Sequence, residues 1–213
     1  MTQCPACGAE WHGTNFCANC GKDLRHDPLA ESKSVRASIS SELDLFRIER
    51  LPSGSYKVLG LIPGLEADVS HLKIPDCVEI IGESAFLGNT RILSVEIGNG
   101  VKVIETRAFQ NCKKLSAVTL GSGLRFIGSA AFSHCVELPR LHVPANVVKI
   151  GDGAFLACTR LEELTVERGL ELIGALAFLE CKGLEGKEIC IPAETICKWM
   201  SFSDNVRVKR VDG

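Results

Sequence analysis

The sequence has little net charge and no long apolar run. Its 24 lysines and arginines nearly balance 26 acidic residues, so the formal net charge is −2. A chain this close to neutrality has no overall attraction to nucleic acid or to an anionic membrane. No segment approaches the roughly eighteen consecutive apolar residues of a membrane-spanning helix. The N-terminal residues MTQCPACGAEW also lack the basic and apolar regions of a signal peptide, so we expect neither export nor anchoring.

Motifs of catalysis are missing as well. The sequence contains neither the dinucleotide-binding pattern G-x-G-x-x-G nor the phosphate-binding pattern G-x-x-x-x-G-K-[ST]. Its five histidines are scattered along the chain: His12, His26, His71, His134 and His142. Because an enzyme of this size should show a nucleophile beside a base, paired carboxylates or a phosphate loop, we predict no enzymatic activity and no small-molecule substrate.

A repeat with a period of 23 residues dominates what is present. The segments IETRAFQNC, IGSAAFSHC and IGDGAFLAC begin at residues 104, 127 and 150. Five phenylalanines share one column of this repeat, each directly after an alanine: Phe86, Phe109, Phe132, Phe155 and Phe178. In four copies a cysteine follows three residues later: Cys112, Cys135, Cys158 and Cys181. Cysteine here is interpreted as a small apolar filler of the core.

Each copy also predicts a short strand. Two further apolar columns lie two residues apart, which is the strand period: Val95, Val118, Leu141 and Leu164, then Ile97, Leu120, Val143 and Val166. One copy cannot bury these side chains alone, whereas copies stacked at roughly 4.8 Å bury every column against its own equivalent. The pattern therefore predicts a repeat solenoid with a short strand and a short helical turn per repeat. Glycine after the isoleucine is expected to permit a sharp turn at Gly82, Gly128, Gly151 and Gly174.

The combined pattern V-x-x-I-G-x-x-A-F-x-x-C-x-x-L-x-x-V-x-L resembles the BspA-type leucine-rich repeat over roughly residues 56–195. We assign residues 45–213 to the solenoid. The segment FRIERLPSGSYKVLGL is expected to form a hairpin that closes its N-terminal end. Residues from about 188 to 213 are expected to form a C-terminal cap, in which Trp199 and Phe202 cover the open end of the core.

The resemblance implies a protein that binds other proteins, and the outward strand positions are the possible partner face. Those positions are His71, Lys73, Ser94, Glu96, Ala117, Thr119, Arg140, His142, Glu163 and Thr165. They are polar, mixed in charge and poor in anchor residues, so a simple solvated sheet is the competing interpretation. We favour a non-catalytic protein-interaction module or scaffold. The alternatives are a structural or accessory protein without a binding face and a nucleic-acid-associated zinc-ribbon protein.

Two C-x-x-C-G pairs lie in the N-terminal segment CPACGAEWHGTNFCANCG. Four thiolates in two such knuckles complete a tetrahedral zinc site, so Cys4, Cys7, Cys17 and Cys20 are the predicted ligands of one structural zinc ion. Residues 1–24 resemble a short zinc ribbon, and residues 25–44 are interpreted as a flexible linker. Four cysteines lie in a metal-binding pattern and four others recur once per repeat, which is an unusual arrangement for disulfide pairing. The cysteine pattern therefore predicts a reducing, cytoplasmic compartment.

Purified protein should contain about one zinc ion per chain, measured by elemental analysis. Replacing both members of one pair, Cys17→Ser with Cys20→Ser, should remove the metal because two of the four ligands are lost. Chelation should leave the repeats folded. A double variant that keeps its zinc would show that the ligand assignment is wrong.

Overall fold

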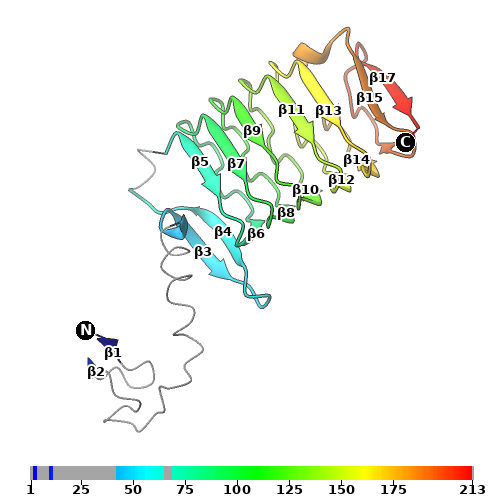
Figure 1. The fold of residues 1–213 in the computed structure, drawn as a ribbon. Helices are drawn as coiled ribbons and strands as arrows, with labels where there is room; N and C mark the ends of the chain where they lie inside the picture. The colour runs from blue at the N-terminus through cyan, green and yellow to red at the C-terminus, as the bar shows by residue number, and fades with distance from the viewer. Residues whose placement is uncertain (1, 4–9, 12–41, 65–68, 213) are drawn as a thin grey trace. The chain divides into compact units, whose positions relative to one another are not determined.

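The computed structural model describes residues 2–3, 10–11, 42–64 and 69–212, which belong to two compact units, Met1–Asp44 and Leu45–Gly213. In the first unit, β1 (Thr2–Gln3) pairs antiparallel with β2 (Glu10–Trp11). The four predicted zinc ligands and most of the predicted linker lie outside the described residues. The second unit is a solenoid, so the predicted architecture is confirmed there (Figure 1).

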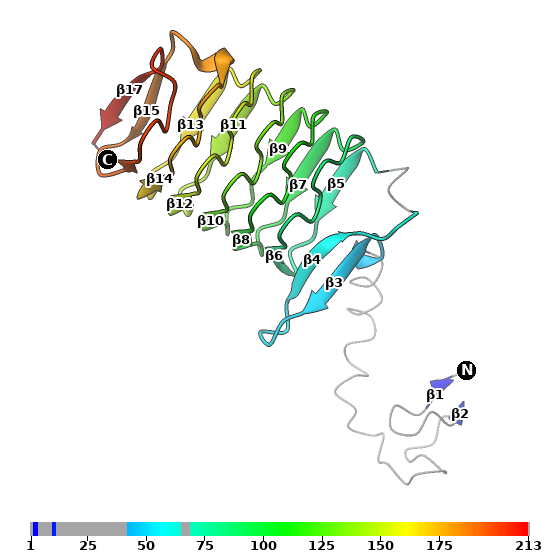
Figure 2. The same cartoon turned by 180° about the vertical axis from the view of Figure 1, so that it is seen from behind.

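The coils of the solenoid place strands in two rows (Figures 1 and 2). The first row, called here the long-strand face, consists of β5 (His71–Ile74), β7 (Ser94–Ile97), β9 (Ala117–Thr119), β11 (Arg140–Val143), β13 (Glu163–Val166), β15 (Glu188–Pro192) and β17 (Arg207–Val211). The second row, called the short-strand sheet, consists of β3 (Phe46–Arg50), β4 (Tyr56–Leu61), β6 (Val78–Ile81), β8 (Val103–Ile104), β10 (Phe126–Ile127), β12 (Lys149–Ile150), β14 (Leu172–Ile173) and β16 (Ile196–Cys197).

Neighbouring coils pair in register, so equivalent residues of successive repeats stand side by side. Leu141 of β11 pairs with Leu164 of β13, for example, in a parallel ladder. Along β11 exposure alternates, with Arg140 and His142 outward and Leu141 and Val143 buried. The predicted inward and outward assignment of the strands is therefore confirmed. This alternation follows from the two-residue period of an extended chain.

Phenylalanine rings form a continuous stack through the core. Successive rings from Phe86 to Phe202 have centroids 4.9–5.3 Å apart and are inclined by at most 15°. At the N-terminal end, β3 and β4 form the expected antiparallel hairpin. Its Phe46 meets Phe86 edge-on, at 6.4 Å and 81°, and so closes the stack with a different geometry.

The predicted helical turn in each repeat is wrong. Within residues 69–212 the one helical element is the 3₁₀ helix η2 (Lys182–Leu184). In the coil of residues 127–135, the N–H of Phe132 donates to Ala154 O of the next coil at 2.7 Å, while Ser133 N–H donates within the coil to Ala130 O. Alternate N–H groups thus point out of the coil, and this requires left-handed residues at Ala130 (φ 54°) and His134 (φ 62°). A helix would direct every N–H back along itself.

The glycines that follow the repeat isoleucines allow successive coils to pack closely. They do not form the sharp turn that we expected. Gly151 and Gly174 do not adopt the left-handed conformation. A Cβ on Gly151 would lie 2.6 Å from the backbone nitrogen of Ser129, and one on Gly174 would lie 2.5 Å from that of Asp152. At these two positions successive coils approach so closely that a side chain would clash, although Glu105 occupies the equivalent position of an earlier coil.

The C-terminal segment differs from the expected cap, because residues 196–205 form another coil. β16 continues the parallel ladder beyond β14, and the Phe202 ring stacks on Phe178 at 5.1 Å. Phe202 therefore covers the last buried ring, as predicted. Trp199 does not, since 72% of its surface is exposed.

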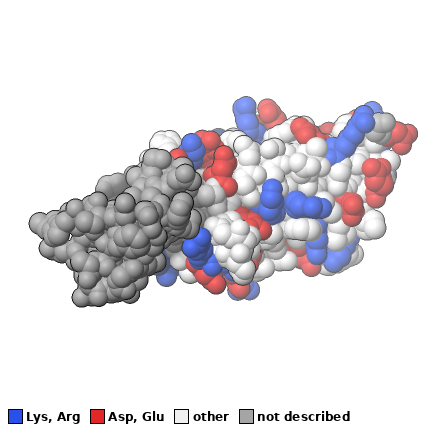
Figure 3. All heavy atoms as spheres, turned by 60° about the horizontal axis from the view of Figure 1, so that its bottom comes forward, with Lys and Arg blue, Asp and Glu red and all other residues white. Residues whose placement is uncertain are grey.

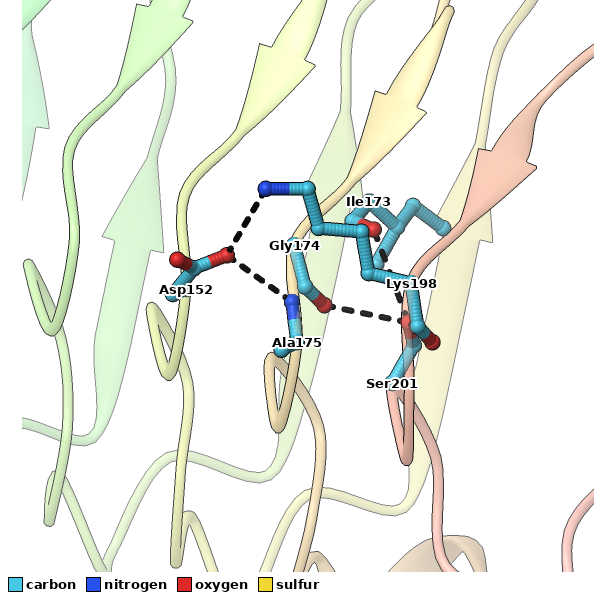
Figure 4. Close-up of polar contacts among 6 residues, drawn as sticks. All are labelled: Asp152, Ile173, Gly174, Ala175, Lys198 and Ser201. Atoms are coloured by element: carbon cyan, nitrogen blue, oxygen red, sulfur yellow. Dashed lines mark hydrogen bonds and ion pairs between the residues drawn. The ribbon is translucent and has the colours of Figure 1, made fainter.

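Polar contacts tie this last coil to the two before it (Figure 4). The buried Ser201 hydroxyl is 3.0 Å from Gly174 O and 2.6 Å from Lys198 O. One oxygen of Asp152 accepts the Ala175 N–H at 2.9 Å and lies 3.7 Å from Lys198 Nζ. Hydrogen bonds to backbone therefore replace the alanine contact that earlier coils make at the position of Ser201.

Phe132→Ala should destabilise the protein strongly. Phe132 is fully buried between two stacked rings, so its removal should leave a cavity and lower the free energy of unfolding by roughly 3–5 kcal/mol. Urea denaturation followed by circular dichroism measures this change. Phe126→Ala is the matched control from the same repeat: Phe126 is 41% exposed, and its loss should cost less than about 1 kcal/mol. Equal losses would contradict the assignment of core and surface.

Candidate interaction surfaces

The predicted partner face is assembled by the fold. Its residues occupy two adjacent rows on the long-strand face, with His71 beside Ser94, Lys73 beside Glu96, and Arg140 beside Glu163. The described members of the two rows project away from the buried columns, and they lie on one side of the solenoid in three short sheets: β5–β7–β9, β11–β13 and β15–β17. The structure extends these rows to β15 and β17, whose residues we had assigned to a cap. Glu188, Arg207 and Lys209 therefore belong to the same face.

Side chains on this face interact mainly with one another. His71 Nδ1 lies 2.7 Å from Ser94 Oγ, and His142 Nε2 lies 3.0 Å from a carboxylate oxygen of Glu167. Lys209 Nζ and Glu188 Oε1 are 3.4 Å apart. Small residues at Ala117 and Ser94 leave a hollow of about 210 Å³ over β5, β7 and β9. The face thus combines a shallow depression with charges of both signs.

Serine–histidine pairs on the solenoid do not form a nucleophilic site. Ser133 Oγ lies 2.7 Å from His134 Nδ1, but Ser133 is only 1% exposed and substrate could not reach it. The exposed pair of His71 and Ser94 has no carboxylate hydrogen-bonded to the imidazole among the described residues. A triad needs such a third group to orient the base. The described residues also contain no group of three or more potential metal ligands.

The cysteine column lies in the core, and its thiols are hydrogen-bonded. Each Sγ donates to the carbonyl of a phenylalanine in the preceding coil, as Cys158 does to Phe132 O at 3.2 Å. All four cysteines have free thiols in the structure. Burial raises the pKa of Cys112 and Cys181 to about 12 and also raises the pKa of Cys135 and Cys158. Thiols of this kind are poor nucleophiles and poor metal ligands because the thiolate is the reactive form.

A second surface lies along the short-strand sheet, and our sequence reasoning missed it. Phe126 and Lys149 point outward from β10 and β12, in register with each other. Beside them is a groove of about 600 Å³ lined by Lys102, Gly123, Arg125, Ala145, Asn146, Val148 and Gly169. Figure 3 shows lysine and arginine side chains in the middle of a mostly uncharged surface. The sequence did contain a signal for this surface, because three successive repeats carry a cation at the same or a neighbouring position: Lys102, Arg125 and Lys149.

The sequence matches the profile of the BspA type leucine rich repeat region over residues 66–185, in six copies. The chain belongs to this family. Its matched segment is the part of the solenoid that carries the buried cysteines and all the parallel-stacked phenylalanines except Phe202. Among the described residues of this leucine-rich repeat protein, no helix is long and apolar enough to cross a membrane. No protein with a curated description is significantly similar to the chain.

Solved structures with the same fold come from several bacteria. A leucine-rich repeat protein of T. pallidum has a TM-score of 0.65 and 21% identity, over 78% of this chain and 83% of that one. A leucine rich cell surface protein of Faecalibacterium prausnitzii has a TM-score of 0.60 and 26% identity, over 67% and 37%. The pneumococcal vaccine antigen PcpA has a TM-score of 0.59 and 23% identity, over 73% and 40%. The chain therefore spans well under half the length of the latter two proteins.

Raising the pH should destabilise this leucine-rich repeat protein through its cysteines. In the unfolded chain a thiol ionises near pH 8.5, whereas burial keeps the core thiols protonated to higher pH. The stability that this difference contributes is fully present below about pH 8.5 and is lost as the pH rises towards 12. The free energy of unfolding should fall by up to about 1.4 kcal/mol per pH unit for each thiol.

Urea titrations between pH 8 and pH 10.5 measure this slope. Lysine, arginine and tyrosine side chains ionise above that range or near its upper end. The variant Cys158→Ser is the matched control, because a serine hydroxyl does not titrate at these pH values. It should show a smaller pH slope than the natural chain. An identical slope would mean that Cys158 is already ionised, or exposed, in the folded protein.

Proposed function

We propose that this chain is a non-catalytic module that binds another protein through the long-strand face. The observation that carries the proposal is the row of outward residues on β5 to β17, which pair in register within three short parallel sheets. None of these side chains is needed to fill the core, because the buried columns between them do so. Solenoid repeats commonly use such an extended sheet surface for binding. Family membership supports a protein partner and leaves its identity open.

The long-strand face favours a polar, mixed-charge partner surface. Arg140 is exposed beside the acidic Glu163, and the imidazole of His142 is held by Glu167. Arginine is the residue type on this stretch that most often anchors an interface. A structural protein without a binding face would need no particular side chains here, and this difference separates the two candidate functions experimentally.

We also propose that the N-terminal segment is a zinc ribbon held by Cys4, Cys7, Cys17 and Cys20. Four thiolates in C-x-x-C-G pairs are the donor set that structural zinc prefers. The strands β1 and β2, which flank the first cysteine pair in sequence, pair antiparallel with each other. With four protein ligands the metal would have no open coordination position, so its role would be to stabilise the fold of this segment.

A cytoplasmic location remains our proposal, but the repeat cysteines do not support it as strongly as their sequence pattern suggested. Buried thiols with a raised pKa resist oxidation in any compartment. The argument therefore depends on the two ribbon pairs alone. One relative is described as a cell surface protein, so cell fractionation with an antibody against the chain is the direct measurement.

The double variant Arg140→Ala with His142→Ala should lose the partner recovered by affinity capture from native lysate, while its melting temperature stays unchanged. Both side chains are exposed, so each substitution should alter stability by less than about 0.5 kcal/mol. The matched control is Arg107→Ala, an exposed arginine in a turn outside both strand rows. Full recovery of the partner by the double variant would show that the partner does not bind through the long-strand face. A large loss of stability would show that the assignment of inward and outward residues is in error.

A further inference from the structure

Three cations lie together along the groove beside the short-strand sheet, and this cluster is distinct from the long-strand face. Lys102 and Arg125 line the groove, and Lys149 follows Val148 at its edge. All three are exposed, and none forms an ion pair with the described residues. Five other basic side chains of the described solenoid do form such pairs with carboxylates: Lys57, His142, Arg160, Lys198 and Lys209. The groove therefore concentrates positive charge that takes part in no ion pair with the described residues.

The groove exists because side chains are missing from its floor. Gly123 and Gly169 lie two repeats apart on turns between the two strand rows, with Asn146 at the equivalent position of the turn between them. A Cβ on Gly123 would lie 1.9 Å from Asn99 O, and one on Gly169 would lie 2.2 Å from Ala145 O, so glycine is required for the coils to approach. Both glycines line the groove together with Lys102 and Arg125.

An apolar side chain adjoins the cations. Phe126 is 41% exposed and stands between Val103 and Lys149 in the ladder of β8, β10 and β12. An aromatic ring beside arginine and lysine is the combination that anchors a peptide through both apolar contact and charge. A ligand suited to this surface carries carboxylates for the cations and an apolar side chain for Phe126.

Acidic residues limit the positive region at both ends. In the column that contains Lys102 and Arg125, the residue before is Glu79 and the last is Glu171. Hydrogen bonds from Ser55 and Ser53 lower the pKa of Glu79, with a smaller contribution from the charge of Lys102, so this carboxylate stays ionised. The cationic stretch covers two to three coils, or roughly 10–15 Å at strand spacing. That length suits a few carboxylates, whereas a long polyanion would meet repulsion at either end.

Nucleic acid fits this surface less well. Single strands bind through successive aromatic rings on which consecutive bases stack. Phe126 is the one aromatic residue in its ladder, whose neighbours are Val103, Lys149 and Leu172. The short positive stretch also offers few phosphate contacts.

We propose that the groove lined by Lys102 and Arg125, together with Phe126 and Lys149, binds an extended acidic segment of a partner protein. The carboxylates of that segment lie against the three cations, and an apolar side chain between them packs on the Phe126 ring. This second surface does not depend on the long-strand face, because the two lie on different strand rows of the solenoid.

Fluorescence anisotropy tests this site with the full chain and a labelled peptide of about eight residues in which glutamate and leucine alternate. The peptide should bind, and its affinity should fall as sodium chloride is added because the contacts are charged. The double variant Arg125→Glu with Lys149→Glu should raise the Kd at least about tenfold, since two attractions become repulsions. Phe126→Ser should weaken binding with less change in the salt dependence.

The matched control is Arg140→Glu, which reverses an exposed arginine on the long-strand face and should leave peptide binding unchanged. An oligothymidylate of equal length tests the competing ligand class. The proposal is overturned if the groove variants bind the peptide as the natural chain does, or if Arg140→Glu weakens it equally. Tighter binding of the oligothymidylate, lost in the same groove variants, would also overturn it in favour of nucleic acid. Neither result bears on capture through the long-strand face, so the two proposals fail independently.

Discussion

Successive coils must meet at about 5 Å with equivalent residues in contact, and the rest of the structure depends on this constraint. The phenylalanine rings show it most directly, with centroid separations of 4.9–5.3 Å along the stack. Backbone N–H groups that alternate between the coil and its neighbour maintain the same spacing in the turn segment. Because each contact is between copies, a residue type favourable in one coil is favourable in all, which explains why the sequence repeats so closely.

The same constraint divides the chain into positions that cannot vary and positions that can. Core columns accept only residues that stack on their own copy, and cysteine meets this requirement because its thiol reaches a carbonyl of the preceding coil. Outward positions carry no such restriction, and they change sign and polarity from coil to coil. The two strand rows consequently present different surfaces: one polar and internally paired, the other bearing unpaired cations beside an exposed aromatic ring.

Several interpretations of the sequence were wrong where contacts between coils, rather than the pattern of side chains, determine the backbone conformation. The alanine–phenylalanine segment has the composition of a short helical turn, but its alternate N–H groups bond to the next coil, which no pattern of apolar residues reveals. The glycine after each isoleucine looked like a turn former and is instead a point of close contact between coils. Residues 196–205 lost the register of the repeat by an extra residue, so a further coil was interpreted as a cap.

The sequence alone determined the solenoid, its stacked phenylalanine core, its N-terminal hairpin and the inward or outward direction of the residues of β5 to β13. These features follow from local spacing, because a period of 2 sets the two faces of a strand and a period of 23 sets the stack. Only the tertiary structure decided that Trp199 is exposed and that Lys102, Arg125, Phe126 and Lys149 share one surface with an open groove. Those residues belong to different repeats and to neighbouring columns, and they come together only when the coils are wound and their turns are placed in three dimensions.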